Sequence, residues 1–245
     1  MNNNKPEYLS DIDYNLLKSI YPNNMDEILS KLKSNYPVQY LIGYVDFYGY
    51  KINVDNRVLI PRFETEGLVN ETIKLIKENI SNPKIIDIGT GSGCIAITLS
   101  KELNIKVDAI DISKPALDLA TENAILNTAN INFYQKDIKN CTFDSQYNVI
   151  ISNPPYVKEN SEVDPKTKFE PQNALFAKDN GLEFYEAILK QSLNILEKRN
   201  LIAFEIGCDE AESIKDLAKK YYPTSIIIIK KDLANLDRYI FIINE

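Results

Sequence analysis

Lys84-Ile85-Ile86-Asp87-Ile88-Gly89-Thr90-Gly91-Ser92-Gly93 is the stretch of sequence that decides the fold. Its apolar half predicts a buried strand, and its glycine half predicts a loop that leads into a helix near Cys94. Glycines let a ligand approach the backbone closely, and the first N–H groups of a helix are free to bind it. No Gly-Lys-Ser/Thr follows, which excludes a P-loop, and Cys94 stands where a dinucleotide fingerprint has its third glycine. We therefore expect a ligand-binding loop that is not a P-loop and that fits NAD or FAD poorly.

Strands and helices alternate along the chain from this loop onward. Strands are expected at about 84–88, 106–110, 131–135 and 147–152, with helices at about 93–103 and 114–127. The C-terminal part adds a helix at about 181–197, a strand at 200–206, a helix at 209–221 and strands at 225–230 and 238–243. Such alternation builds a mostly parallel sheet with helices on both faces. The sequence predicts an α/β fold whose last two strands pair as an antiparallel hairpin.

The chain ahead of the main domain has a different pattern. Two short helices are expected within residues 8–35, and the aromatic residues around Gly49 predict a β-hairpin. A longer helix is expected to begin near Glu64. We therefore divide the chain into a short helical N-terminal domain, a β-hairpin linker and a main domain, which span residues 1–43, 44–62 and 63–245.

The composition is that of a globular protein, and it excludes several kinds of catalytic and metal site. Of 245 residues, 44% are hydrophobic and 26% are charged, which excludes disordered and fibrous classes. The absence of histidine excludes a Ser-His-Asp triad, a Cys-His dyad and histidine-bearing metal sites. Three scattered cysteines are too few for a zinc site, so no metal is expected. The net charge of -7 argues against binding nucleic acid by broad neutralisation of phosphates.

The sequence predicts a cytoplasmic protein. Residues 1–6 contain no apolar signal core, and no stretch approaches the ~20 apolar residues that span a bilayer. An odd number of cysteines suits a reducing compartment. We therefore expect neither secretion nor association with a membrane.

Asp111 ends the second expected strand, about twenty residues after the glycine loop. An acid at this place accepts hydrogen bonds from both ribose hydroxyls of an adenosine group, so the loop and Asp111 predict an adenosine ligand without phosphates. The alternative is structural, with the glycines making a tight turn and Asp111 capping the next helix. Asp87 also has two interpretations: it orients a bound amino group, or it ties the loop together.

The fourth expected strand ends in Asn153-Pro154-Pro155-Tyr156, at the same edge of the sheet. Proline has no N–H and pushes its predecessor into extended geometry, so this turn is stiff and its carbonyls are unpaired. The Asn153 side-chain oxygen and the Pro154 carbonyl can each accept one N–H of a planar NH2 group, while Tyr156 packs on its flat face. The segment 153–180 is long for a loop, and such loops usually carry function.

This arrangement suits methyl transfer to a planar nitrogen. An amide nitrogen is a poor nucleophile because its lone pair is delocalised into the carbonyl. Two fixed acceptors hold both N–H bonds so that the lone pair points at an electrophilic methyl group, such as that of S-adenosylmethionine. The nitrogen loses its proton after the transfer, so no histidine base is required. The alternative is a rigid Pro-Pro turn without a catalytic role.

The glycine loop, Asp87-Ile88-Gly89-Thr90-Gly91, and the Asn153 to Tyr156 segment together resemble the Rossmann-like methyltransferases that modify exocyclic or amide nitrogens. Three more segments narrow the resemblance: Pro37-Val38-Gln39-Tyr40-Leu41-Ile42-Gly43, Pro61-Arg62-Phe63-Glu64-Thr65-Glu66 and Phe169-Glu170-Pro171-Gln172-Asn173-Ala174-Leu175. They are similar to the P-x-Q-Y-x-x-G, P-R-P-E-T-E and F-E-P-x-x-A-L segments of the release-factor glutamine methyltransferases, the HemK/PrmC family. The one departure in the second segment is Phe63, which replaces a proline.

The resemblance implies methylation of the glutamine side-chain nitrogen (N5) in the Gly-Gly-Gln motif of peptide chain release factors, which modulates translation termination. The donor is S-adenosylmethionine and the product S-adenosylhomocysteine, without a metal or a direct nucleic-acid substrate, and we expect a monomer. The implied cofactor residues are Asp87, Ile88, Gly89, Thr90, Gly91, Asp111, Asp137, Ile138 and Asn153. The implied substrate residues are Asn153, Pro154, Pro155, Tyr156, Arg62, Glu64 and Glu66, of which Asn153, Pro154 and Tyr156 are catalytic. The segment around Glu170 is expected to fold over the site as part of a lid.

Other interpretations remain open. Glu64 and Glu66 equally suit the first turn of a helix, where carboxylates complement the helix dipole. An adenine-N6 or guanine-N2 nucleic-acid methyltransferase would place a flipped base in the same loop, although the charge of -7 and the P-x-Q-Y and F-E-P segments count against it. A catalytically silent adenosine-binding protein would not need Asn153 and both prolines.

Overall fold

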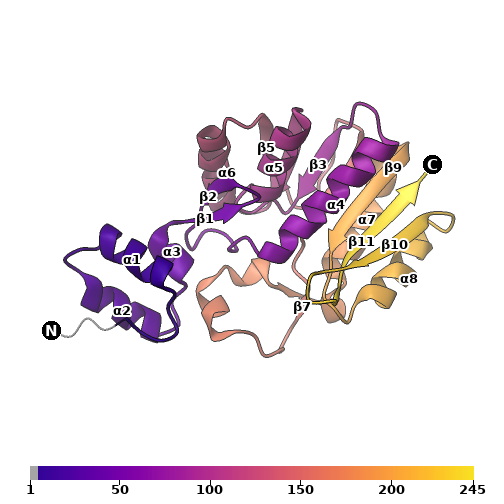
Figure 1. The fold of residues 1–245 in the computed structure, drawn as a ribbon. Helices are drawn as coiled ribbons and strands as arrows, with labels where there is room; N and C mark the ends of the chain where they lie inside the picture. Colours follow the sequence, from indigo (N-terminus) through magenta and orange to yellow (C-terminus); the bar gives the residue numbers. More distant parts are fainter. Residues whose placement is uncertain (1–4) are drawn as a thin grey trace.

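A seven-stranded sheet forms the centre of the molecule (Figure 1). The structure is a computed structural model that describes residues 5–245. Met1 to Asn4, which belong to the predicted N-terminal domain and to the segment predicted to lack a signal core, lie outside the described residues. The strand order is β10 (Ile226–Lys231), β11 (Asp237–Asn244), β9 (Leu196–Glu205), β6 (Tyr147–Ser152), β3 (Ile85–Ile88), β4 (Val107–Asp111) and β5 (Ile131–Gln135). The strands from β9 to β5 are parallel, and β11 runs antiparallel to both β9 and β10. The predicted α/β sheet with an antiparallel C-terminal hairpin is therefore confirmed.

Helices cover both faces of the sheet. One face carries α4 (Phe63–Asn79), α5 (Cys94–Leu103) and α6 (Lys114–Asn127), and the other carries α7 (Glu183–Ile195) and α8 (Ala211–Tyr221). The central strand β6 is buried along its whole length: Val149 and Ile151 pack with the first group of helices, and Ile150 packs with the second. Burial of each such side chain contributes about 1.5–3 kcal/mol to the stability of the fold. This stability holds the loop after β6 in place. No helix of residues 5–245 has the length and apolar character needed to cross a bilayer.

The boundary between α7 and β9 differs from the prediction. Leu196 and Glu197 were expected in the helix, but they begin β9. The reason is tertiary, because Leu196 pairs with Tyr147 at the start of the parallel ladder between β6 and β9. An apolar residue at this position fits a helix and a buried strand equally well, so the pattern alone does not place the boundary.

Three helices at the N-terminal end form a small core of their own around Leu17 and Ile28 (Figure 1). They are α1 (Asp11–Ile20), α2 (Met25–Lys33) and α3 (Val38–Ile42). The first two were predicted. The third was not, because five residues span little more than one turn and show no period. It ends at Gly43, whose φ of 88° turns the chain toward the hairpin.

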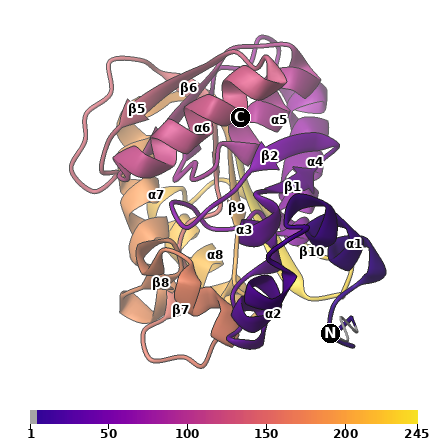
Figure 2. The ribbon, with the colours of Figure 1, turned by 90° about the vertical axis from the view of Figure 1, so that its left-hand side faces the viewer.

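The predicted hairpin is present as β1 (Tyr44–Phe47) and β2 (Tyr50–Asn53), which pair antiparallel. Figure 2 shows β2 beside α6, and one side chain joins them. The Asn123 side-chain oxygen accepts from the Asn53 N–H at 2.8 Å, and its NH2 donates to the Asn53 carbonyl at 3.0 Å. Both donor and acceptor of one strand residue are thus satisfied, which fixes the linker on the main domain.

The segment after β6 is more ordered than the expected loop. It contains β7 (Val157–Lys158), η1 (Pro165–Phe169), η2 (Gln172–Ala174), β8 (Phe176–Ala177) and η3 (Asp179–Gly181). The two short strands pair in parallel. Glu170 anchors the middle of the segment: it is 4% exposed and accepts from the Ile60 N–H at 3.0 Å and from the Arg62 guanidinium at 2.7 Å. The segment is therefore tied to the linker in front of α4.

Candidate active site

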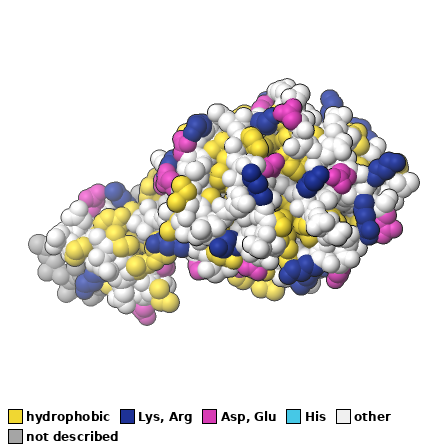
Figure 3. All heavy atoms as spheres, turned by 90° about the horizontal axis from the view of Figure 1, so that it is seen from above, with side chains coloured by type: hydrophobic (Ala, Val, Ile, Leu, Met, Phe, Trp, Pro, Cys, Tyr) yellow, Lys and Arg dark blue, Asp and Glu magenta, His cyan; other side chains and the backbone are white. Residues whose placement is uncertain are grey.

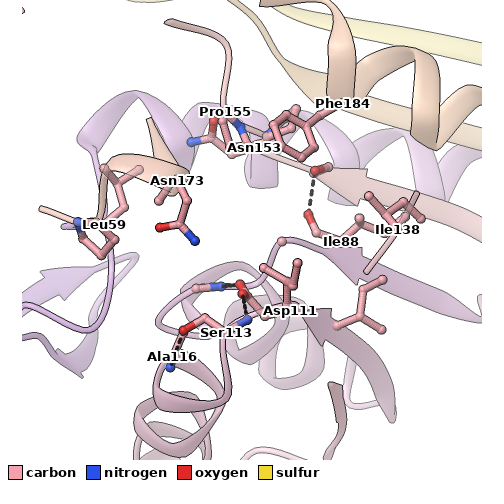
Figure 4. A pocket seen from close by; sticks show the side chains of 18 of the residues that line it. Leu59, Ile88, Asp111, Ser113, Ala116, Ile138, Asn153, Pro155, Asn173 and Phe184 are labelled. Atoms are coloured by element: carbon pink, nitrogen blue, oxygen red, sulfur yellow. Dashed lines mark hydrogen bonds between the residues drawn. The ribbon is translucent and has the colours of Figure 1, made fainter. Parts of the chain in front are cut away.

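A cavity of about 330 Å³ opens at the carboxyl ends of β3, β4 and β6 (Figure 4). Parallel strands end at one edge of a sheet, so the loops that follow them meet there. The predicted residues that line this cavity are Ile88, Gly89, Gly91, Asp111, Asp137, Ile138, Asn153, Pro154 and Pro155. The fold therefore brings the predicted cofactor loop and the predicted reaction loop to one place.

The glycine loop presents bare backbone to the cavity. Gly89 and Gly91 have φ values of 74° and 53°, in the left-handed region that favours glycine. A Cβ atom at either position would meet no heavy atom within 4 Å. The N–H groups of Gly89 and Thr90 donate to the Ile110 carbonyl at 2.9 and 3.0 Å, which fixes the loop on β4. Thr90 itself is buried and lies outside the lining.

Asp87 is fully buried beside this loop and does not line the cavity. Its Oδ2 accepts from the Thr90 hydroxyl at 2.6 Å, as the loop-tying interpretation expected. Within residues 5–245, no group donates to Oδ1 with hydrogen-bond geometry, although the Ala96 N–H lies near enough to favour the charged carboxylate. Burial raises the pKa of Asp87 to about 7. One oxygen thus holds the loop, and the other is an unpaired buried acceptor.

Asp111 is held facing the cavity by backbone donors (Figure 4). Its Oδ2 accepts from the Gly91 N–H at 2.9 Å, and its Oδ1 accepts from the Ser113 N–H at 2.8 Å. Burial raises its pKa above the usual value, and the backbone N–H groups oppose this. The cap of α6 is Ser113, whose hydroxyl accepts from the Ala116 N–H. Each Asp111 oxygen keeps a lone pair for a further donor, such as a ribose hydroxyl.

An apolar wall completes this end of the cavity. Ile138, Ile88 and Phe184 lie on the same side in Figure 4. Asp137 precedes this wall and uses its carboxylate locally, because it accepts from the Lys139 N–H and from the Asn140 side chain, both at 3.0 Å. The local bonds hold the turn that presents Ile138 to the cavity.

Asn153 stands at the opposite side of the cavity from Asp111 (Figure 4). Its side-chain nitrogen donates to the Thr65 hydroxyl at 3.1 Å, and that hydroxyl donates to Glu205 Oε2 at 2.7 Å. Within residues 5–245, neither the Asn153 side-chain oxygen nor the Pro154 carbonyl accepts a hydrogen bond. Two acceptors on a stiff turn therefore remain available to a ligand.

The predicted residues Tyr156, Glu64 and Glu66 lie outside the lining of the cavity. Glu64 and Glu66 stand in the first turn of α4, and Glu66 accepts from the Tyr48 N–H at 3.0 Å. This placement supports the helix-dipole interpretation. Tyr156 is partly buried, and burial with the nearby Glu205 raises its pKa to about 12, so its hydroxyl keeps its proton. A substrate role for these three residues stays a prediction.

Arg62, the other predicted border residue, also lies outside the lining and pairs with Glu170. The Glu170 side chain is 1% exposed and the Arg62 side chain 35%. The pair connects the F-E-P segment to the linker, and neighbouring residues of that segment, Pro171 and Asn173, do line the cavity. The prediction that Arg62 borders the site remains open.

Several residues that the structure places at or behind the cavity were not predicted from the sequence. Those that line it include Arg57, Leu59, Ser113, Asn173 and Phe184. The Asn173 amide points into the cavity in Figure 4, and its signal was a polar residue inside the F-E-P segment. Thr65 and Glu205 lie behind Asn153, and the signal for Glu205 was a carboxylate that ends an apolar strand.

Metal ligands are not gathered at this site. Among residues 5–245, no group of three or more His, Cys, Asp or Glu side chains is placed to hold a metal ion. Cys94 is buried, Cys141 is partly buried and Cys208 is exposed, and all three are free thiols. The polar groups that face the cavity include carboxylate, amide and carbonyl oxygens, which can accept hydrogen bonds from an organic ligand.

Comparisons with known proteins identify the relatives of this chain. A family model described as the methyltransferase small domain matches residues 67–174. A release factor glutamine methyltransferase of Lactococcus lactis is 41% identical over 221 residues, which cover 88% of this chain and 80% of the relative. A release factor glutamine methyltransferase of Flavobacterium psychrophilum is 40% identical over 223 residues, which cover 88% and 78%.

Solved structures share the fold at low sequence identity. A methyltransferase from Pyrococcus furiosus gives a TM-score of 0.61 at 17% identity and covers 91% of this chain and 98% of its own. A Thermus thermophilus 16S rRNA N2 G1207 methyltransferase, in complex with AdoMet and guanosine, gives 0.61 at 11% identity and covers 82% and 50%. These likenesses show a common methyltransferase fold. The level of identity to the two sequence relatives, over most of both chains, shows more: this chain belongs to the family of release factor glutamine methyltransferases.

Proposed function

We propose that this protein transfers the methyl group of S-adenosylmethionine to the side-chain nitrogen (N5) of the glutamine in the Gly-Gly-Gln motif of peptide chain release factors, and so modulates translation termination. The observation that carries the proposal is one cavity lined by the glycine loop, Asp111 and Asn153-Pro154-Pro155. The names of relatives at 40% and 41% identity support the release factor as acceptor.

The residues at one end of the cavity fit S-adenosylmethionine. Gly89 and Gly91 leave open space beside a fixed backbone, as a closely bound ligand requires. The lone pairs of Asp111 suit two ribose hydroxyls. Asp87 does not line the cavity, so its carboxylate would favour a cationic amino group by charge from behind the loop. When bound, S-adenosylmethionine supplies an electrophilic methyl group on a positively charged sulfur and is left as S-adenosylhomocysteine. Of the nine predicted cofactor residues, those proposed to contact it at this end of the cavity are Ile88, Gly89, Gly91, Asp111, Asp137 and Ile138, with Asp87 and Thr90 behind the loop and Asn153 at the other end.

The other end of the cavity suits a carboxamide. The Asn153 oxygen and the Pro154 carbonyl would each accept one N–H of the glutamine side chain, which holds the NH2 group still and aims its lone pair. By analogy with a fixed oxyanion donor, each such group is worth about 2.7–4 kcal/mol of barrier. The nitrogen sheds one proton after the new N–C bond has formed, so the chain needs no histidine.

The charge distribution supports a protein acceptor. The formal charge is -7, and basic and acidic side chains are interspersed over the face shown in Figure 3. A continuous basic surface would be needed to neutralise many phosphates. We accordingly infer a release factor as the macromolecular partner and no direct nucleic-acid substrate. The monomeric enzyme and the place in the cytoplasm that the sequence predicts belong to the same proposal.

The test is a transfer assay with labelled S-adenosylmethionine and three acceptors: a purified release factor, the same factor with its Gly-Gly-Gln glutamine changed to glutamate, and total RNA with genomic DNA. We expect label on the intact release factor alone, and mass spectrometry should place it on the glutamine side chain. Label on nucleic acid without label on the release factor would establish the base methyltransferase alternative instead.

A further inference from the structure

Three polar side chains from distant elements form a chain that ends at the cavity. Glu205 closes β9, Thr65 lies in the first turn of α4 and Asn153 follows β6. The Thr65 hydroxyl donates to Glu205 at 2.7 Å and accepts from the Asn153 side-chain nitrogen at 3.1 Å. Glu205 and Thr65 are each 2% exposed, so water does not replace either bond.

The hydrogen bonds among these three side chains all point the same way, from Asn153 to Thr65 and from Thr65 to Glu205. An ionised carboxylate only accepts, so the single proton of the Thr65 hydroxyl goes to Glu205. The Thr65 oxygen is then left as an acceptor, which attracts the NH2 of Asn153 and repels its carbonyl oxygen. The two ends of an asparagine amide have nearly the same size, so packing does not distinguish them and hydrogen bonding must. The Asn153 oxygen is consequently turned away from Thr65.

This direction is that of the ionised form of Glu205, which prevails above about pH 7. Burial raises its pKa to about 7, while the Thr65 hydroxyl, Arg238 and the Asn153 amide favour the charged form, and Glu64 opposes it. The Tyr185 hydroxyl donates to the backbone carbonyl of Glu205 at 2.7 Å and leaves its carboxylate to the other groups. The carboxylate is therefore hydrogen-bonded by Thr65 and favoured by the Asn153 amide, the two other members of the hydrogen-bonded series.

We propose that Thr65 and Glu205 are positioning residues that fix the Asn153 amide with its oxygen toward the acceptor NH2 group. The proposal rests on the proposed function, because it assigns a reason for the orientation that methyl transfer to an amide requires. Thr65 and Glu205 do not line the cavity and act only through Asn153.

The consequence of losing this control is specific. A flipped Asn153 would present its own N–H groups to the N–H groups of the acceptor, and two donors that face each other leave both unpaired. The lone pair of the acceptor nitrogen would no longer be aimed, so turnover would fall while the cofactor end of the cavity stayed intact. A purely structural role would instead lower stability without a selective loss of kcat.

The experiment compares Thr65→Val, Thr65→Ser and a control, Thr72→Val. Thr72 lies in the same helix, is fully buried and donates its hydroxyl to the Leu68 carbonyl at 2.7 Å, with no link to Asn153. We expect Thr65→Val to lower kcat about 10–100-fold, the usual effect of removing a residue that orients a functional ligand, with the Kd for S-adenosylmethionine unchanged. Thr65→Ser should restore most of kcat, and Thr72→Val should leave kcat unchanged despite a similar loss of Tm.

A second pair of variants tests the other end of the chain. Glu205→Gln keeps an oxygen that can accept from Thr65, whereas Glu205→Leu removes the acceptor and frees the Thr65 proton to bond the Asn153 oxygen. We expect Glu205→Leu to match Thr65→Val and the double variant to be no slower than either single variant, because one orientation is lost only once. Equal kcat in Thr65→Val and Thr72→Val would overturn the proposal.

A measurement without acceptor separates this proposal from the proposed function. The side-chain NH2 resonances of Asn153, assigned by NMR in the full-length protein, should shift in Thr65→Val and stay in place in Thr72→Val. If the wild-type protein methylates no release factor but these resonances behave as expected, the proposed function fails and the orientation stands. If the wild-type protein is active and the resonances respond equally to both variants, the positioning role fails.

Discussion

The two ends of the cavity are held in different ways. At the cofactor end, backbone groups do the holding: the Gly91 N–H bonds Asp111, 20 residues away, and the Gly89 N–H bonds the Ile110 carbonyl. At the acceptor end, side chains from remote elements meet. Asn153 bonds Thr65 across 88 residues, and Thr65 bonds Glu205 across 140.

This difference separates the effects of substitution at the two ends. A backbone N–H is present whatever the side chain, so the cofactor end depends on few side chains beyond Asp111, the glycines and the Asp87–Thr90 pair that ties the loop. The acceptor end depends on an unbroken series of side chains, each from another element. Changes there should appear in turnover, and changes at Asp111 should appear in cofactor affinity.

Asn153→Ala should have the largest effect of all. It removes one of the two proposed acceptors of the glutamine NH2, so we expect kcat to fall about 100–1000-fold, as when a fixed oxyanion donor is removed. The Kd for S-adenosylmethionine, measured by titration calorimetry, should stay within a few-fold. Asn132→Ala is the control, because that amide donates to Asp108 at 2.8 Å and does not line the cavity. Equal losses of binding and turnover would assign Asn153 to the cofactor end.

Asp111→Ala should have the next largest effect, and on the other quantity. Hydrogen bonds to a charged group are worth about 1.5–3 kcal/mol, so the Kd for S-adenosylmethionine should rise about 10–100-fold. Asp118→Ala is the control, since that acid lies on α6 and is half exposed in an ion pair with Lys114. An unchanged Kd in Asp111→Ala would contradict the ribose assignment.

The same difference explains how far the sequence could predict the structure. The glycine loop and Asp111 belong to one β-α-β unit, and their pattern was enough to place them in one site. Thr65 and Glu205 meet only because α4 packs on β9, and no local pattern encodes a contact over 140 residues. The apolar run that ends in Glu205 was visible, yet the buried carboxylate has meaning only once its partner is known.

The elements of the fold followed a similar rule. Long helices and buried strands were predicted closely because their periods repeat within one element. The helix α3 and the strands β7 and β8 were missed because they contain five, two and two residues. Their stability comes from other parts of the chain, as when the Tyr40 hydroxyl donates to the Val58 carbonyl at 2.6 Å.

Each end of the cavity also buries an acid, and this predicts a pH dependence of stability. Burial raises the pKa of Asp87 and of Glu205 to about 7 from ordinary values of 3.8 and 4.5. Between those values and about pH 7, the folded chain holds protons that the unfolded chain has lost, so stability falls as pH rises and levels off above 7. The change is about 1.4 kcal/mol for each pKa unit and each group.

The urea-unfolding free energy at several pH values checks this prediction. Asp87→Asn and Glu205→Gln should each flatten the slope between about pH 5 and 7, because an amide does not titrate. Asp118→Asn should leave the slope unchanged, since its carboxylate is half exposed. A slope that is the same in the wild-type protein and in both buried variants would show that neither acid keeps its proton on folding.

Glu170→Gln should have the smallest effect on stability and on the kinetic constants. It also tests to which end of the cavity residues 153–180 belong. Glutamine keeps an oxygen for the Ile60 N–H but loses the charge that pairs with Arg62, whose side chain is 35% exposed and therefore partly hydrated. We expect a loss of about 1 kcal/mol in stability and a few-fold rise in the KM for the release factor. Glu186→Gln, which breaks an exposed pair with Lys220, is the control and should change neither. Because Glu170 ties residues 153–180 to the linker, an unchanged Kd for S-adenosylmethionine would place this segment with the acceptor, and a weakened one would place it with the cofactor.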